Sequence, residues 1–277
     1  MNVRRTVLAL ALACHPGPTV AVTTVTAVLA VAVGHGLGSG VLVTAAVLAG
    51  QLSIGWGNDW LDRERDRRSS RRDKPIAAGA VAPATVLTAA LAAVGGCVVL
   101  SLLNGTVPGT LHLAAVAWAW AYNLGLKATV ASPVPFAVSF GLLPAFVVAA
   151  APGSEPAPVW MVLAGALLGT GAHFANVLPD LDDDAATGVR GLGHRLGRRG
   201  CAATAAVLLL AAVAVLALGP PGPPTPGGLA ALLLTVPTGA LGLVLTRRPG
   251  SRAAFTSVLV IAVVAVTLLV TSGTRLR

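Results

Sequence analysis

Charged residues are scarce in this sequence, at 10% of its 277 residues. A soluble domain carries roughly 25%, so this chain has too little charge to cover a surface that faces water. Its 55% hydrophobic content falls instead into apolar runs, and runs of about 20 residues are long enough to cross a bilayer. Disorder, a collagen-like chain and a soluble enzyme are therefore excluded. The composition predicts a polytopic membrane protein.

Cysteine is also rare, with three isolated residues at positions 14, 97 and 201. Their number is odd and their spacing is not that of metal ligands, so we expect small apolar packing residues rather than a disulfide or a zinc site. The net charge of +9 would suit nucleic acid, but the cations lie in loops beside apolar runs. Membrane topology explains them better. We expect the lipid bilayer as a partner, with no nucleic acid and no obligate protein partner.

The apolar runs can be drawn as nine spans separated by segments rich in Gly, Pro or charge. The sequence therefore predicts a single all-α integral membrane domain over residues 1–277, with nine transmembrane helices. A short amphipathic helix that ends near His15 is favoured over a cleaved signal peptide. The predicted spans are residues 17–35, 38–57, 82–103, 107–123, 133–151, 157–178, 200–219, 226–246 and 252–272.

The Lys and Arg residues divide unequally between the two sides of this arrangement. With a cytoplasmic N-terminus, 17 of the 19 lie in cytoplasmic segments and only two lie outside, in the C-terminal tail. This agrees with the positive-inside rule and requires an odd number of spans. We expect a multi-pass protein of the cell membrane whose N-terminus is cytoplasmic and whose C-terminus is outside.

Nine of the ten acidic residues fall in two short clusters, both on the predicted cytoplasmic face. The first cluster follows the second span without a break and is expected to continue its helix. Asp59, Asp62 and Asp66 are spaced i, i+3 and i+7, which predicts one helical face, and Asn58 is one turn from Asp62. Carboxylate and amide oxygens on one face suit hard cations such as Mg²⁺.

The second cluster closes the sixth span, where Asp180 and Asp184 share a helical face. Like charges this dense destabilise a helix, so they need compensating cations. Two such clusters that face one another across a helical cavity would bind a diphosphate through bridging Mg²⁺, with help from neighbouring Arg and Lys. Two solvated, salt-bridged loops are the alternative, and the pairing of the clusters disfavours it.

These motifs resemble those of the UbiA superfamily of intramembrane aromatic and lipid prenyltransferases. The resemblance covers about residues 50–200. It rests on Asn58-Asp59-x-x-Asp62-x-x-x-Asp66 and Asp180-x-x-x-Asp184, on the segments 72–79 and 184–190 that follow them, and on a third signature at Tyr122–Lys127.

The resemblance implies a bundle of nine helices around a central cavity, capped by cytoplasmic loops. It implies that an isoprenyl diphosphate is bound through two Mg²⁺ ions and ionises to an allylic cation, which a hydrophobic or aromatic acceptor traps. The implied catalytic residues are Asp62, Asp66, Asp180 and Asp184, which with Asn58 would also hold the metal.

Several other polar residues have two readings each. Lys127 either snorkels as a topology marker or binds the diphosphate, and its place in the third signature favours the ligand. Arg72 and Lys74 are expected to reach the diphosphate, and the alternative is a surface charge. Tyr122, the one tyrosine, either anchors the chain at the interface or contacts the cation or the acceptor.

His173 lies about two turns before the second cluster, inside the sixth span. It is expected to line the cavity or act as a base, and a helix-to-helix hydrogen bond is equally open. Asp59, Asp182 and Asp183 are expected to tune the metal sites from behind the ligands, with Asn176 nearby in the cavity wall.

Ala128 follows Lys127, whereas the 4-hydroxybenzoate branch of the family has Arg at this place. A benzoate acceptor is therefore in doubt, and quinone-head, lipid, phenolic and sugar-phosphate acceptors stay open. A terpene cyclase of the same fold, which would quench the cation within the substrate, is the alternative function. A transporter is disfavoured because both acid clusters lie at one interface rather than at mid-membrane.

Overall fold

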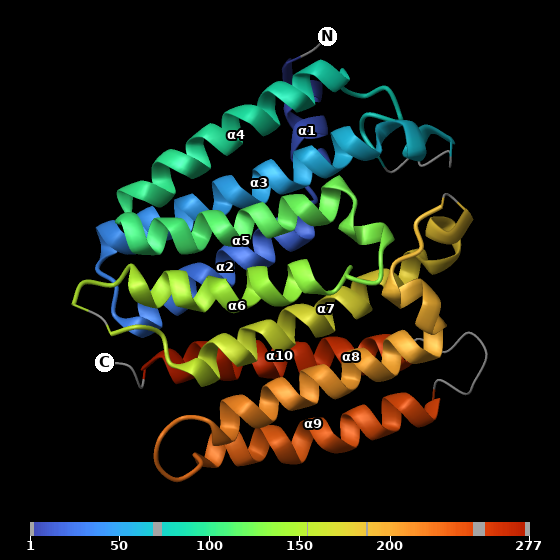
Figure 1. The fold of residues 1–277 in the computed structure, drawn as a ribbon. Helices are drawn as coiled ribbons and strands as arrows, with labels where there is room; N and C mark the ends of the chain where they lie inside the picture. The colour runs from blue at the N-terminus through green and yellow to red at the C-terminus, as the bar shows by residue number, and fades with distance from the viewer. Residues whose placement is uncertain (1–2, 69–73, 154, 187, 246–252, 275–277) are drawn as a thin grey trace.

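The computed structural model describes residues 3–68, 74–153, 155–186, 188–245 and 253–274, and every regular element in these ranges is helical (Figure 1). Ten are α-helices, and a short 3-10 helix, η1, lies between the fifth and sixth of them. The elements are α1 (Val3–Ala13), α2 (Pro16–Val33), α3 (Leu37–Arg68), α4 (Pro83–Leu103), α5 (Thr106–Leu124), η1 (Leu126–Ala128), α6 (Val134–Ala149), α7 (Val159–Ala186), α8 (Leu192–Leu218), α9 (Pro226–Leu245) and α10 (Ala253–Gly273).

Proline and glycine set several helix ends. Pro16 and Pro83 begin α2 and α4, at positions in the first turn where a backbone N–H would have no partner within the helix. Gly34 ends α2 in the left-handed region, at φ 97°. Its N–H donates to the carbonyl of Val31, and the next N–H donates to that of Ala30. This closure satisfies carbonyls that the helix end would otherwise leave unpaired.

Consecutive helices run back and forth between the two ends of the bundle (Figure 1). The α3–α4, α5–α6 and α7–α8 connections lie at one end, and the α2–α3, α4–α5, α6–α7 and α8–α9 connections lie at the other. Helices α2, α3, α5, α6, α7 and α10 pack in a ring that the α2–α10 contact closes. Helix α4 packs outside on α3 and α5, and α9 packs outside on α8 and α10.

Six helices in the described part of the chain are long and apolar enough to cross a membrane: α2, α3, α4, α7, α8 and α10. Helices α6 and α9 include shorter apolar stretches of 10–17 residues. Each of α2 to α10 overlaps one of the nine predicted spans, and α1 adds a tenth helix. The multi-pass character is therefore confirmed, whereas nine crossings stay a prediction.

Small residues let α6 and α7 approach closely. A Cβ on Gly169 of α7 would lie 2.5 Å from the carbonyl oxygen of Phe136 and 2.5 Å from the Cβ of Phe140, both on α6. Close backbone approach of this kind is how helices associate in lipid, where no hydrophobic effect drives them together. It fixes α6 beside α7, and both helices border the apolar cavity described below.

Replacing Gly169 with alanine is expected to destabilise the protein by about 1–3 kcal/mol, because the added methyl group overpacks this contact. Gly96→Ala on α4 is the matched control, since nothing lies within 4 Å of the Cβ it would add. A helical glycine to alanine change in open space stabilises by up to about 1 kcal/mol. Thermal unfolding of both variants in one detergent measures the difference, and equal unfolding temperatures would contradict the close contact.

Candidate active site

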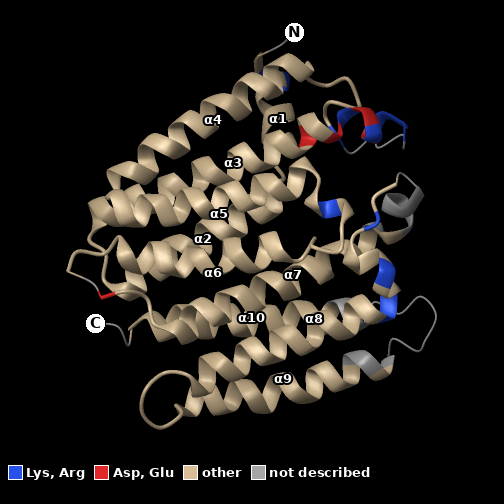
Figure 2. Ribbon diagram, viewed as in Figure 1, with Lys and Arg blue, Asp and Glu red and all other residues tan. Residues whose placement is uncertain are grey.

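Charged residues gather at one end of the bundle (Figure 2). This is the end where α3 and α7 terminate, where η1 lies and where α8 begins (Figure 1). Helix α3 extends to Arg68 and so carries the first acid cluster on its last turns, as predicted. The described helices thus bring both predicted acid-bearing segments to the same end of the molecule.

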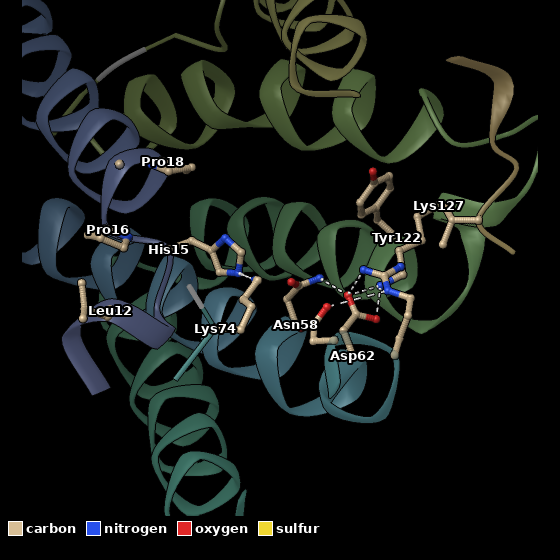
Figure 3. Close-up of a pocket in the computed structure, with 13 residues that line it drawn as sticks. Leu12, His15, Pro16, Pro18, Asn58, Asp62, Lys74, Tyr122 and Lys127 are labelled. Atoms are coloured by element: carbon tan, nitrogen blue, oxygen red, sulfur yellow. Dashed lines mark hydrogen bonds and ion pairs between the residues drawn. The ribbon is translucent and has the colours of Figure 1, made fainter. Parts of the chain in front are cut away.

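A polar cavity of about 410 Å³ opens at this end (Figure 3). One wall comes from α3, a second from α5 and η1, and a third from the junction between α1 and α2. The lining residues are Leu12, His15, Pro16, Gly17, Pro18, Asn58, Asp62, Arg65, Asp66, Lys74, Tyr122, Lys127 and Val189. Six of these thirteen were singled out from the sequence as site residues.

Asp62 stands at the centre of the interactions in this cavity. The ammonium group of Lys127 lies 2.5 Å and 2.6 Å from the two carboxylate oxygens. The guanidinium group of Arg65 donates to Oδ2 at 2.9 Å. The Asp62 residue is only 8% exposed, so its charge is held by two cations at the edge of the protein interior rather than by water alone. Charge-assisted pairs of this kind are stronger than neutral hydrogen bonds.

Asn58 lies one turn before Asp62 and is oriented by hydrogen bonds from its amide nitrogen. That nitrogen donates to Asp62 Oδ2 at 3.2 Å and to Asn123 Oδ1 at 3.1 Å. Asn123 in turn donates to the carbonyl of Ile54 at 3.0 Å. Among the described residues nothing donates to the amide oxygen of Asn58, which leaves an oxygen ligand in the cavity wall.

Asp66 lines the same cavity one turn further along α3 and is 3% exposed. Its Oδ1 lies 4.0 Å from the Nε of Arg65. Its Oδ2 is buried and has no hydrogen-bond partner among the residues that the structure describes. A buried carboxylate oxygen without a partner costs free energy, and a cation in the cavity would remove that cost.

Asp59 lies behind the cavity wall rather than in it. It is 1% exposed and pairs with Lys74 at 3.3 Å. Lys74 also lies 2.9 Å from the Nε2 of His15, and both of these residues line the cavity. Lys74 therefore joins the segment before α4 to α3 and to the α1–α2 junction. Arg72, which was predicted to reach the diphosphate beside Lys74, lies outside the described residues.

The second acid cluster lies on the last turns of α7. The side chains of Asp180, Asp182, Asp183 and Asp184 are outside the described part, so the predicted facing of the two clusters stays a prediction. The chain on either side of the cluster borders the cavities, however. Val189 lines the polar cavity, and Asn176 lines the apolar cavity described next.

The oxygen donors on α3 fit a hard cation in type. Among the described side chains, no three carboxylate, imidazole or thiol groups converge on one metal position. Asn58, Asp62 and Asp66 nevertheless share one cavity, and Asp66 has the unpartnered oxygen. The second cluster, which the sequence predicts to supply further carboxylates, lies outside the described side chains.

An apolar cavity of about 340 Å³ lies deeper in the bundle and shares His15, Pro18, Asn58 and Tyr122 with the polar one. Aliphatic and aromatic side chains of α2, α3, α5 and α6 form most of its wall. The Tyr122 ring packs edge-on against Phe136, with 5.1 Å between the ring centroids. A ligand with a charged head and an apolar tail could therefore occupy both cavities at once.

His173 is not among the residues that line either cavity. It is 1% exposed and shares a hydrogen bond of 3.1 Å with the hydroxyl of Ser132. That hydroxyl oxygen also accepts the N–H of Leu192 at 3.1 Å. The His173 ring lies 5.8 Å from that of Tyr122, so it supports a cavity residue from behind. The hydrogen bond observed runs from His173 on α7 to the turn that precedes α6, and not from one helix to another.

No sequence pattern singled out His15, Arg65, Asn123 or the segment Pro16–Pro18 as site residues. Arg65 and Asn123 lie inside the recognised motifs, so a turn-by-turn reading of those motifs could have found them. The signal for His15 in the sequence was weaker, namely its position directly before the prolines that open α2. In the structure it has φ 56°, a left-handed conformation unusual for a residue other than glycine.

The known proteins that this chain resembles in sequence are prenyltransferases. The model of the UbiA prenyltransferase family matches residues 18–263. A 4-hydroxybenzoate octaprenyltransferase from Ralstonia nicotianae is 32% identical over 145 residues, or 51% of this chain and 49% of that protein. Protoheme IX farnesyltransferase 2 from Natronomonas pharaonis is 33% identical over 156 residues, or 54% of this chain and 36% of that protein. The matched region thus spans half or less of either relative's length.

Solved structures share the fold. A UbiA homologue from Aeropyrum pernix superposes with a TM-score of 0.71 at 19% identity, over 92% of this chain and 98% of that chain. A UbiA homologue from Archaeoglobus fulgidus, bound to GPP and Mg²⁺, gives 0.70 at 15% identity, over 95% and 99%. At these identities the likeness establishes the fold alone.

Proposed function

The chain belongs to the UbiA prenyltransferase family, and on that premise we propose that it transfers an isoprenyl group from an isoprenyl diphosphate to a hydrophobic or aromatic acceptor, with Mg²⁺ as cofactor. The observation that carries the proposal is the position of Asp62. It is held by Lys127 and Arg65 in a polar cavity that adjoins an apolar one.

The proposed orientation in the cell membrane has the N-terminus and the Asp-rich ends of α3 and α7 on the cytoplasmic side. Nine crossings by α2 to α10, within one catalytic domain, would then leave the C-terminus outside. The gathering of charge at one end of the bundle (Figure 2) supports this orientation, because cytoplasmic segments carry the excess of Lys and Arg.

The residues proposed to hold two Mg²⁺ ions are Asn58, Asp62, Asp66, Asp180 and Asp184. Bound there, the metal would neutralise the charge of the diphosphate leaving group. The unpartnered oxygen of Asp66 and the oxygen-only donor set of α3 support this assignment. GPP and Mg²⁺ are bound together in the A. fulgidus homologue.

The protein's own cations are proposed to bind the diphosphate. Lys127, Arg65 and Lys74 line the polar cavity, and Arg72 is proposed to join them. Each ammonium or guanidinium group can form charge-assisted hydrogen bonds to phosphate oxygens. As the bond between carbon and oxygen breaks, negative charge grows on the leaving group, so these cations stabilise the transition state more than the ground state.

The apolar cavity is proposed to hold the isoprenyl chain and to keep water from the cation. Tyr122 and Phe136 line it, and Tyr122 also lines the polar cavity. Aromatic faces attract cations, so these rings would stabilise the allylic cation where it forms. Water that entered there would hydrolyse the cation, which is why a closed apolar wall matters.

The acceptor is proposed to be a quinone-head, lipid, phenolic or sugar-phosphate molecule. In η1 the residue after Lys127 is alanine, so this position offers no guanidinium group to an acceptor carboxylate. Loss of a proton from the acceptor then completes the transfer. The identity of the acceptor decides which group takes that proton.

The proposal is tested with purified protein, Mg²⁺ and C10, C15 and C20 diphosphates, with and without a panel of those acceptors. We expect release of pyrophosphate that EDTA abolishes, together with a prenylated acceptor identified by mass spectrometry. A cyclic hydrocarbon formed without any acceptor would instead identify a cyclase. The absence of pyrophosphate release under every condition, or release that persists in EDTA, would refute the proposal.

A further inference from the structure

The apolar cavity has a defined depth. On α3 its wall runs from Asn58 down to Val47, and on α5 it runs from Asn123 down to His112. Each wall covers eleven steps along its helix, which at the helical rise corresponds to about 16 Å. The upper end joins the polar cavity at Asn58. An isoprenyl chain whose diphosphate lies in the polar cavity would therefore extend toward His112.

His112 is fixed at the deep end by two contacts. The hydroxyl of Ser101 on α4 donates to the carbonyl of Cys97 at 2.5 Å. Because that hydrogen is used, the 2.7 Å contact between Ser101 Oγ and His112 Nδ1 requires the histidine to be the donor. The imidazole also stacks on Phe146 of α6, with 4.6 Å between centroids and an interplanar angle of 19°.

The other ring nitrogen of His112 is then an acceptor that faces apolar surroundings. With Nδ1 protonated, neutral imidazole has a lone pair on Nε2. None of the described residues donates to it, although His112 is only 3% exposed. A Cβ on Gly50 of α3 would lie 3.4 Å from this nitrogen, so the α3 backbone passes close to it. The end of the cavity is thus a polar acceptor within apolar walls.

Contact between an apolar chain and this hydrogen-bond acceptor lowers the affinity of the chain for the cavity. A chain that ends above Nε2 gains affinity with every carbon it buries. A chain that covers Nε2 shields the lone pair without offering a donor, and leaving one buried acceptor unpaired in this way lowers affinity on the order of tenfold.

We propose that His112 is the floor that limits the length of the isoprenyl donor, an inference that rests on the proposed function of the site. An extended chain advances by roughly 1.2 Å per bond, as an extended polypeptide does. By the same measure geranyl, farnesyl and geranylgeranyl chains reach roughly 8, 13 and 18 Å. The first two end within the cavity, whereas the third meets His112. The donor class is therefore C10 to C15.

The test measures dissociation constants of C10, C15 and C20 diphosphates on the purified full-length chain with Mg²⁺, beside inorganic pyrophosphate as the head group alone. The wild type is expected to bind C15 more tightly than C10, and C20 on the order of tenfold more weakly than C15. His112→Ala deepens the cavity and removes the acceptor, so C20 should regain on the order of tenfold relative to C15.

Two further variants distinguish a limit on donor length set by His112 from a general loss of folding or of binding. His112→Phe keeps a ring on Phe146 but removes the acceptor, so it should relieve C20 less than His112→Ala and leave C10 unchanged. Cys97→Ala alters the neighbour of Ser101 without lining either cavity, and it should preserve the wild-type order of affinities. Size-exclusion profiles confirm that each variant is folded.

The outcomes distinguish the limit on donor length at His112 from the proposed function on which it rests. Wild-type protein that binds C20 as tightly as C15, or a His112→Ala variant that weakens all three donors equally, would overturn the floor while Mg²⁺-dependent binding of the shorter donors still supported the function. Absence of Mg²⁺-dependent affinity for pyrophosphate and for every donor would overturn both.

Discussion

Asp62→Ala is expected to lower kcat/KM for pyrophosphate release by roughly 10²–10³-fold, the range found when one group that stabilises transition-state charge is removed. Asp62 is the one described residue that contacts Asn58, Arg65 and Lys127 together. Its loss removes a proposed metal ligand and also frees two cations from the geometry in which they would meet the diphosphate. Steady-state assays with a C10 donor over a range of Mg²⁺ concentrations measure the effect.

Glu64→Ala is the matched control for this substitution. Glu64 belongs to the same helical turn, but its side chain is 56% exposed, pairs with Arg67 and does not line the cavity. An exposed pair contributes roughly 0–1 kcal/mol, so activity should stay within about twofold of the wild type. Equal losses in the two variants would show that the first cluster acts through surface charge alone. An active Asp62→Ala variant would remove Asp62 from the mechanism.

The helix that carries the first cluster could be predicted because the required information is local. No proline or glycine interrupts residues 58–68, and the spacing of Asp59, Asp62 and Asp66 at i, i+3 and i+7 predicts one helical face, with Asn58 one turn before Asp62. In the structure Asp62, Asp66 and Asn58 line one cavity, whereas Asp59 does not. Asp59, one position further around the helix, packs behind the wall with Lys74 instead.

The α1–α2 wall of the site could not be predicted, because it depends on contacts between distant segments. His15 reaches the cavity only because the chain before it is fastened to α3. The indole N–H of Trp56 donates to the carbonyl of Leu10 at 2.8 Å, and a Cβ on Gly55 would collide with the backbone of Cys14. No periodicity within residues 3–18 reveals these partners. The contact between Lys74 and His15 could not be predicted either, since it depends on how the segment before α4 folds back.

The same limit applies to the floor of the apolar cavity. His112 and Ser101 are eleven residues apart on successive helices, and Phe146 lies on a third. A histidine inside an apolar span signals a functional or packing role, but only the arrangement of α3, α4, α5 and α6 shows which of its nitrogens is left to the cavity. Sequence patterns therefore indicate the chemistry of the head group better than the shape of the space for the tail.

Lys127→Met is expected to have opposite effects on two measurements. The ammonium group that holds both oxygens of Asp62 competes with any other cation for that carboxylate. Its removal should therefore tighten Mg²⁺ binding to the protein without diphosphate, measured by calorimetry. It should also lower kcat/KM with a C10 donor by about 10- to 100-fold, because a hydrogen bond to a charged group is lost.

Lys127→Arg separates the charge of this residue from its shape. It keeps a cation in η1 beside Asp62 and should recover part of the activity lost in Lys127→Met, although the broader guanidinium group cannot occupy the same position. A topology marker would behave differently, because methionine would then lower the amount of inserted protein and arginine would preserve it, while neither would change Mg²⁺ affinity. If Lys127→Met weakened Mg²⁺ binding, Lys127 would be supporting the Asp62 carboxylate instead of competing for it, and diphosphate binding would have to rest on Arg65 and Lys74.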